Sequence, residues 1–173
     1  MIKVFTFGLS KIEMADCPST GAMAADKDLV NMGYTNENSA QLTMEVPDST
    51  EFNAEEVEDP VLIIKKAKSV TVEWDIMNPS PDDMVRLMGG TASKSEASLS
   101  DNDQWEPPID EPTIEQCLRV TPKQGLGISI PRADITATFG GTYSKSELVL
   151  LHVSAKVMAP TSSTVKRFKM FKV

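Results

Sequence analysis

The sequence predicts a mainly β protein: an antiparallel β-sandwich or barrel-like sheet with one short flanking α-helix and long loops. Two observations predict this class. Apolar and polar residues alternate along several segments, as in strands that bury one face. In contrast, one segment has the capping residues and apolar spacing typical of a helix. At roughly 150 residues per domain, a chain of 173 residues is expected to form one domain, 1–173.

The clearest strand is predicted over residues 69–77, where apolar residues occupy the even positions from 70 to 76 and polar residues the odd positions from 69 to 75. Glu73 and Asp75 therefore lie on a solvent-facing side, and Trp74 lies in the core. Along 126–139 the alternation slips at Pro131-Arg132, which predicts a bulge or an edge. Further strands are predicted at 41–46, 111–121, 147–158 and 165–173, with a turn at Gly140-Gly141.

A helix is predicted at about residues 80–88. Ser80 is a capping residue, Pro81 occupies the first helical position, and Gly89 can end the helix in a left-handed conformation. A further helical turn is expected at 53–58. Residues 16–38 and 91–112 are predicted as long loops, and residues 161–173 as a C-terminal arm.

The chain has 25 acidic and 17 basic residues, a net charge of −8 and a single His. This balance argues against a protein that grips nucleic acid, because phosphate binding relies on clustered Lys and Arg. The charge is also segregated along the chain. Acidic residues dominate 1–60 and 101–115, whereas the last eighteen residues hold five bases and no acid.

No motif points to catalysis, a metal or a cofactor, so we expect a protein that is not an enzyme. The loop after Cys17 lacks the Arg of a phosphate-binding thiol loop, and residues 101–112 lack the Gly and final acid of a calcium loop. We interpret His152 as a core or interface residue. Cys17 and Cys117 can in principle pair, but reduced thiols are the expectation. Trp105 is the aromatic residue expected to touch a partner.

The first nine residues are interrupted by Lys3 and do not resemble a signal peptide. The longest uncharged apolar stretch, 148–153, is far shorter than the ~20 residues of a membrane-spanning helix. The sequence therefore predicts a protein made in the cytoplasm, with no membrane partner.

Three segments taken together resemble a known family. A strand over 69–78 continues into a helix that ends in Gly-Gly-Thr at 89–91, and residues 126–139 lead to a long strand closed by Ala159-Pro160. The segment 28–34, from Asp-Leu-Val to Gly-Tyr, precedes them. This order is similar to the major tail tube proteins of long-tailed, siphovirus-like bacteriophages and prophages, in a branch associated with Bacteroidales. The resemblance covers roughly residues 28–160 and rests on no single diagnostic motif.

The resemblance implies a tail-tube fold and a structural role. Six copies would form a ring, and the rings would stack around the tape-measure protein, in contact with other tail proteins. DNA would later pass through without being held. The protein would be made in the bacterial host cytoplasm and end in the virion tail. The immunoglobulin-like domain that some family members append is absent from this sequence.

Two hypotheses name residues. Glu73 and Asp75 are expected to face the lumen, where acidic side chains repel DNA phosphates. The acidic segment 51–59 of one ring is expected to meet the basic segment 166–172 of the next. The candidate interface residues are Glu51, Glu55, Glu56, Glu58, Trp105, Lys166, Arg167, Lys169 and Lys172.

Two alternatives stay open. One is a monomeric β-sandwich binding or adhesion module, and the other is a different structural protein of the phage head or of the head–tail junction. The mass of the protein in solution discriminates them, because a tube protein forms rings or rods.

Overall fold

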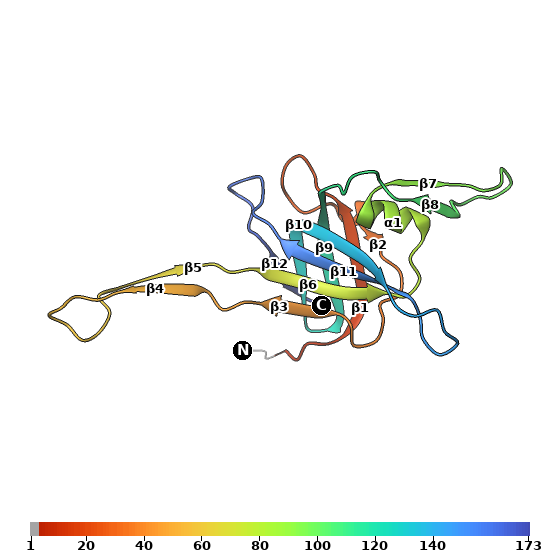
Figure 1. Ribbon diagram of the computed structural model, residues 1–173. Coiled ribbons are helices and arrows are strands. Elements are labelled where there is room, and N and C mark those ends of the chain that lie inside the picture. Colours follow the sequence, from red (N-terminus) through yellow and green to blue (C-terminus); the bar gives the residue numbers. More distant parts are fainter. Residues whose placement is uncertain (1–3) are drawn as a thin grey trace.

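The computed structural model describes residues 4–173, and it confirms a mainly antiparallel β architecture with one short α-helix (Figure 1). The helix α1 spans Pro81–Met88, and a single 3-10 turn spans Asp26–Asp28. The strands are β1 (Phe7–Asp16), β2 (Val30–Asn31), β3 (Gln41–Met44), β4 (Asp48–Phe52), β5 (Leu62–Lys66), β6 (Val70–Ile76), β7 (Thr91–Ser93), β8 (Gln104–Glu106), β9 (Ile114–Gln124), β10 (Leu126–Gly140), β11 (Leu150–Val157) and β12 (Lys169–Lys172).

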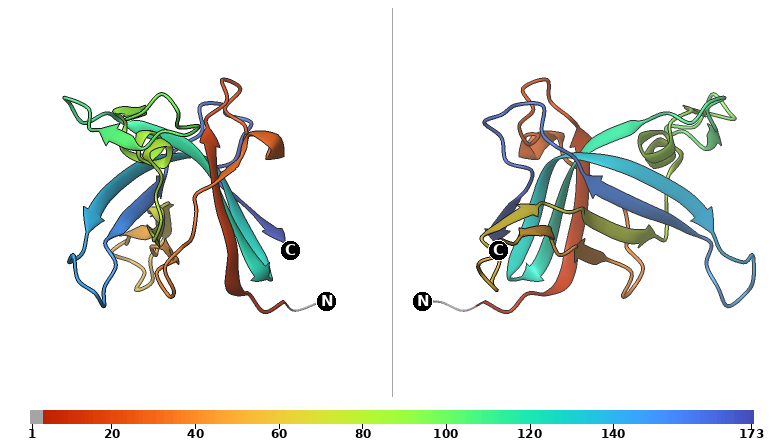
Figure 2. Two further views of the ribbon diagram at one scale, coloured as in Figure 1. Left: turned by 90° about the vertical axis from the view of Figure 1, so that its right-hand side faces the viewer. Right: turned by 60° about the vertical axis from the view of Figure 1, so that its left-hand side comes forward.

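Eight of these strands form a single antiparallel sheet in the order β2-β1-β9-β10-β11-β6-β3, with β12 paired to β10 beside this path. The other four form two separate hairpins, β4–β5 and β7–β8. The sandwich-like shape therefore arises from one sheet that bends over its own core, and its two halves diverge like the sides of a V (Figure 2).

The bend lies at a β-bulge in β10. Ile130 is opposite Leu118 of β9, but Ala133 is opposite Gln116, so β10 has one residue more than its partner between these pairs. Before the bulge the other edge of β10 pairs with β12, and after it that edge pairs with β11. The phase slip predicted at Pro131-Arg132 is thus confirmed as a bulge, which bends and twists the strand.

Both halves of the sheet contribute to one apolar core. The buried side chains of β6 and β11 lie in the same cluster as those of β1, β9 and the first half of β10. The alternation predicted for 69–77 and 147–158 is confirmed, since the apolar positions of both strands are buried and Trp74 is among the largest buried side chains. In β3, however, all four residues are exposed, because it is an edge strand at one end of the sheet.

The helix begins and ends where its sequence predicts. Ser80 caps it, with its Oγ accepting a hydrogen bond from the Asp83 N–H while the Asp83 carboxylate accepts one from the Ser80 N–H. Gly90 follows with φ of 86°, and a Cβ there would stand 2.1 Å from the Glu106 carbonyl oxygen of β8. Leu87 anchors the helix in the core. Position 90 therefore requires glycine, both for its positive φ and because β8 approaches so closely.

Four local expectations differ from the structure. Residues 53–58 form no helix but part of the loop that joins β4 to β5, with a single turn in which the Val57 N–H donates to the Ala54 carbonyl. The 91–112 segment contains the β7–β8 hairpin, and 16–38 contains β2 and the 3-10 turn. Residues 161–173 are not a free arm, because β12 pairs with β10 of the same chain.

An ion pair fastens the bulge to β9. Arg132, inside the bulge, donates two hydrogen bonds of 2.7 Å to the carboxylate of Glu115, and its Nη1 donates to the Ala159 carbonyl at 3.1 Å. The Arg132 guanidinium holds the pKa of Glu115 below its usual value of 4.5. A carboxyl with a lowered pKa stabilises the fold above its unfolded pKa, and this contribution is lost as the pH falls through the folded value.

We therefore expect Glu115→Gln to lower the Tm at neutral pH and to reduce the further fall in Tm between about pH 6 and pH 3. Glu111→Gln, at an exposed glutamate shortly before β9, is the matched control. Thermal unfolding followed by circular dichroism across this range measures both. Equal pH profiles for the two variants would contradict the assignment.

Candidate assembly surfaces

The β4–β5 hairpin is an arm that extends away from the body of the protein (Figure 1). It continues the β3–β6 ladder beyond Pro47, and the Lys68 ammonium pairs with Asp48 at 2.9 Å at its base. Apart from the half-buried Ala54, every residue from 47 to 67 is exposed. A two-stranded hairpin alone in water is at best marginally stable. The arm therefore lacks the packing that stabilises the other strands.

The arm is amphipathic. Opposite residues of an antiparallel pair share a face, and Thr50 lies opposite Ile64 while Phe52 lies opposite Leu62. These four residues form what we call the apolar face of the arm. The other face carries Ser49, Glu51, Ile63 and Lys65. Phe52, Leu62 and Ile64 are each about half exposed, so the apolar face is uncovered in the single subunit.

The acidic residues predicted to lie at an interface sit along this arm and at its tip. Glu51 is on β4, and Glu55, Glu56 and Glu58 are exposed in the loop that joins β4 to β5. The tip is at the end of the arm farthest from the body (Figure 1). Its negative charge is thus separated from the basic C-terminal segment of the same subunit.

The basic segment runs along the edge of the sheet. Lys166, Lys169 and Lys172 are exposed, whereas Arg167 is half-buried and donates a 3.4 Å hydrogen bond to the Lys68 carbonyl at the base of the arm. A cavity of about 600 Å³ lies beside it, lined by Lys166, Lys169 and apolar side chains from the 22–26 and 165–171 segments. Arg119 also lines this cavity, where it pairs with Asp26 at 2.6 Å and lies 5.9 Å from the centre of the Phe171 ring.

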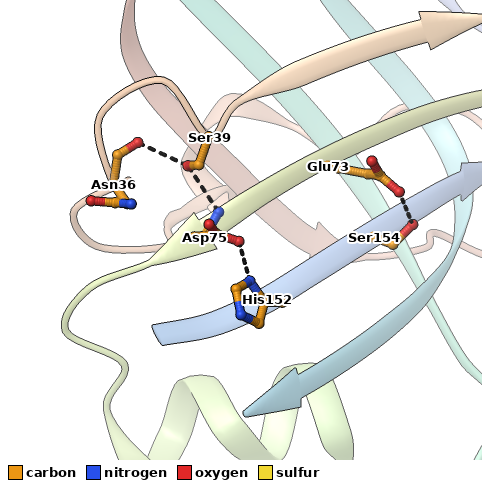
Figure 3. A network of polar contacts seen from close by, with 6 residues as sticks. All are labelled: Asn36, Ser39, Glu73, Asp75, His152 and Ser154. Atoms are coloured by element: carbon orange, nitrogen blue, oxygen red, sulfur yellow. Dashed lines mark hydrogen bonds and ion pairs between the residues drawn. The ribbon is translucent and has the colours of Figure 1, made fainter. Parts of the chain in front are cut away.

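The solvent-facing side of β6 and β11 carries a polar network, which Figure 3 shows from close by. Asp75 accepts a 2.5 Å contact from the His152 Nδ1, and Ser154 donates to Glu73 at 3.5 Å. Ser39, before β3, accepts a hydrogen bond from the Asp75 N–H and donates one to the Asn36 carbonyl. Glu73 and Asp75 are thus on one face, and both interact with β11.

His152 is exposed rather than in the core. The core interpretation was wrong because the residue lies between two buried positions, Leu151 and Val153, whose side chains point to the opposite face. Its pairing with Asp75 follows from the β6–β11 register, in which the two residues are directly opposite.

Trp105 has a structural contact. It lies on β8, half-buried, and its Nε1 donates a 2.9 Å hydrogen bond to the Gly89 carbonyl just after α1. This bond satisfies a carbonyl at the end of the helix. The structure thus places Trp105 against α1, apart from the arm and the basic segment (Figure 1).

The apolar face of the arm was missed in the sequence. The run Val61-Leu62-Ile63-Ile64 was a usable signal, because a short apolar run bounded by a Pro and charged residues is consistent with a strand. That this run is exposed could not be predicted from its sequence, since the same pattern is typical of a buried strand.

Within residues 4–173, no set of three His, Cys, Asp or Glu side chains is arranged to hold a metal ion. The helices of the described chain are all too short or too polar to cross a membrane. No protein-family model matches the chain, and no curated protein matches it at a significant level.

Proposed function

We propose that this protein is a non-enzymatic structural subunit that assembles with copies of itself into stacked rings, as the tail tube of a phage or prophage. The observation that supports this most is the exposed apolar face of the β4–β5 arm. The resemblance in the sequence adds the tube architecture, with six copies in each ring.

The arm favours self-association for an energetic reason. Fully burying an apolar side chain of the size of Phe, Leu or Ile stabilises by ~1.5–3 kcal/mol. Because Phe52, Leu62 and Ile64 are each about half exposed, part of this gain is absent while the arm projects into water. A neighbouring subunit that covers the arm recovers it. In such a contact the arm of one copy binds a different surface, on the body of the next copy. A contact between two different surfaces is heterologous, and repeated heterologous contacts produce rings or filaments.

The edges of the sheet support the same role. Among the described strands, β3 pairs only with β6 and β12 only with β10, so each has a free edge. Leu42 and Met44 on β3 are both about two-fifths exposed. An exposed edge with apolar side chains is a template for pairing with another chain. In a ring, such edges are closed by neighbours.

The charge distribution suits both stacking and DNA passage. The basic residues near β12 lie beside the base of the arm, whereas the acidic tip is at its far end (Figure 1). The tip can therefore meet a basic segment only on a neighbouring copy, as in head-to-tail stacking. Each exposed pair contributes only ~0–1 kcal/mol, and the effect depends on repetition around the ring. A lumen lined by Glu73 and Asp75 repels phosphates, so that DNA is not retained.

Substitution of Ile64 tests the arm. We expect Ile64→Ser to raise the protein concentration needed for assembly by roughly 10-fold, because its burial at the interface is worth on the order of 1.5 kcal/mol. Ile63→Ser is the matched control: the two isoleucines are adjacent and similarly exposed but lie on opposite faces. Both subunits should stay folded by circular dichroism. Light scattering and negative-stain electron microscopy measure assembly.

A wild type that forms neither rings nor rods at high concentration would contradict the tube and favour the monomeric binding module. Closed shells or isolated rings would instead favour another head or head–tail protein. If Ile63→Ser and Ile64→Ser assemble equally, the apolar face of the arm is not the contact.

Charge reversal tests stacking. The triple substitution Lys166→Glu, Lys169→Glu and Lys172→Glu is expected to shorten the rods at low salt, with a smaller effect at high salt because ions screen exposed charges. The matched control reverses Lys94, Lys123 and Lys145, which are also exposed but lie outside the basic segment. Unchanged rod lengths in electron micrographs would remove the stacking hypothesis.

The lumen assignment has a direct structural test. A density map of the assembled tube is expected to place Glu73, Asp75 and His152 on the inner wall, since the three share one sheet face. Their appearance on the outer wall would exclude the assignment, without affecting the arm contact.

A further inference from the structure

Two cysteines that are far apart in the sequence lie side by side in the fold. In the register of β1 and β9, Ala15 is opposite Cys117, and Cys17 follows β1 by one residue after Asp16. Cys17 packs against a small buried cluster of Ala15, Ala24 and Cys117. Because Met14 and Leu118, the neighbours of Ala15 and Cys117, belong to the main core, this cluster occupies the opposite face of the sheet.

The two thiols differ in access. Cys117 is fully buried, and its Sγ donates a 3.0 Å hydrogen bond to the Pro131 carbonyl in the bulge of β10. Cys17 is only half-buried. Both are free thiols in this structure. A reagent can therefore reach Cys17 from solvent, and Cys117 is next to the sulfur that the reagent would modify.

The environment also favours a thiolate at the buried position. A side-chain hydrogen bond from Cys17 lowers the pKa of Cys117 to about 7. The same hydrogen bond, together with burial, raises the pKa of Cys17. The thiolate is the nucleophile in disulfide exchange. Because Cys17 packs against the cluster that contains Cys117, a modified Cys17 sulfur would lie next to this nucleophile.

We propose that Cys17 and Cys117 form an intramolecular disulfide when the protein meets a thiol oxidant, and that this bond fastens the 17–25 segment to β9 beside the bulge. The inference is independent of the proposed function, because it concerns one subunit. It also differs from the expectation of reduced thiols, which rested on the presence of only two Cys in a chain of this length without a recognisable signal peptide.

The chemistry balances with a small disulfide such as oxidised glutathione as the oxidant. Cys17 reacts first, although its pKa is raised, because Cys117 is buried and out of reach of the oxidant. The Cys17 sulfur attacks the oxidant and forms a mixed disulfide, and the glutathione thiolate that leaves takes up the Cys17 proton. The Cys117 sulfur then attacks Cys17 and releases the second glutathione, which takes the Cys117 proton. One S–S bond breaks and one forms, and the protein passes two electrons to glutathione.

The bond would change what holds the 17–25 segment. At present this segment is tied by a turn in which the Gly21 N–H donates to the Pro18 carbonyl, and by the pairing of Asp26 with Arg119 just beyond it. A disulfide adds a covalent tie and removes the S–H that Cys117 donates to Pro131. Oxidation therefore links the segment to the same bulge that bends the sheet.

The test equilibrates the full chain with reduced and oxidised glutathione at several ratios, blocks free thiols with an alkylating reagent and digests with trypsin. Under oxidising conditions we expect the peptides 12–27 and 95–119 to be joined, and to separate on reduction with dithiothreitol. The Tm of the oxidised protein is expected to rise by roughly 5–10 °C, because a cross-link between distant residues constrains the unfolded chain.

Two variants sharpen the result. Cys117→Ser leaves the accessible thiol alone, so it should accumulate a stable glutathione adduct at Cys17. Cys17→Ser leaves only the buried thiol, so it should resist the adduct and show no rise in Tm. The proposal is overturned if wild-type thiols are fully alkylated after unfolding at every ratio, if a glutathione adduct accumulates on wild type, or if the peptides join only between two chains.

Discussion

The bulge at Pro131-Arg132 is the constraint on which the rest of the structure depends. One extra residue in β10 lets a single strand serve two halves of the sheet, with β12 on its free edge before the bulge and β11 after it. A flat sheet of these strands would leave one apolar face in water, whereas the bent sheet closes on itself and buries both halves in one core.

The polar groups of the bulge are satisfied by neighbouring elements: Cys117 donates to the Pro131 carbonyl, the Met158 N–H donates to the Arg132 carbonyl, and Glu115 accepts from the guanidinium. Both carbonyls of the bulge, those of Pro131 and Arg132, thus have hydrogen-bond partners.

Closing the core in this way leaves particular parts of the chain outside it. The β3–β6 ladder runs past the edge of the sheet and becomes the β4–β5 arm, where no second layer covers the apolar face. The same bend leaves β3 at one end of the sheet. An uncovered apolar arm and an open edge on one subunit are incomplete structures that a copy of the subunit can complete. This is the physical basis for interpreting the protein as an assembly component, and it is independent of any motif.

The face of the sheet that points away from the core has different chemistry in its two halves. Where β6 and β11 are adjacent, the outer face is polar, and Asp75 with His152 and Glu73 with Ser154 form cross-strand pairs. Where β1 and β9 are adjacent, the face opposite the core is covered by the 17–29 segment over Ala15 and Cys117. The first half is therefore solvated and charged, while the second carries a small apolar patch that brings two thiols together. Both properties follow from strand alternation, which places neighbours in sequence on opposite faces.

The sequence by itself determined the local features. The alternation in β6 and β11, the slip at Pro131-Arg132 and the caps of α1 were all predictable, because period, capping and glycine conformation depend on residues close in the chain.

The tertiary structure alone decided the pairings and the exposure. Val61–Ile64 has the pattern of a buried strand, yet β5 is in the arm because its partner is β4 and nothing packs on the pair. His152 is exposed between two buried neighbours, Trp105 contacts the end of α1, and Cys17 meets Cys117, each through a register or packing contact between distant segments. Such contacts are set by how the whole sheet closes, and no local pattern records them.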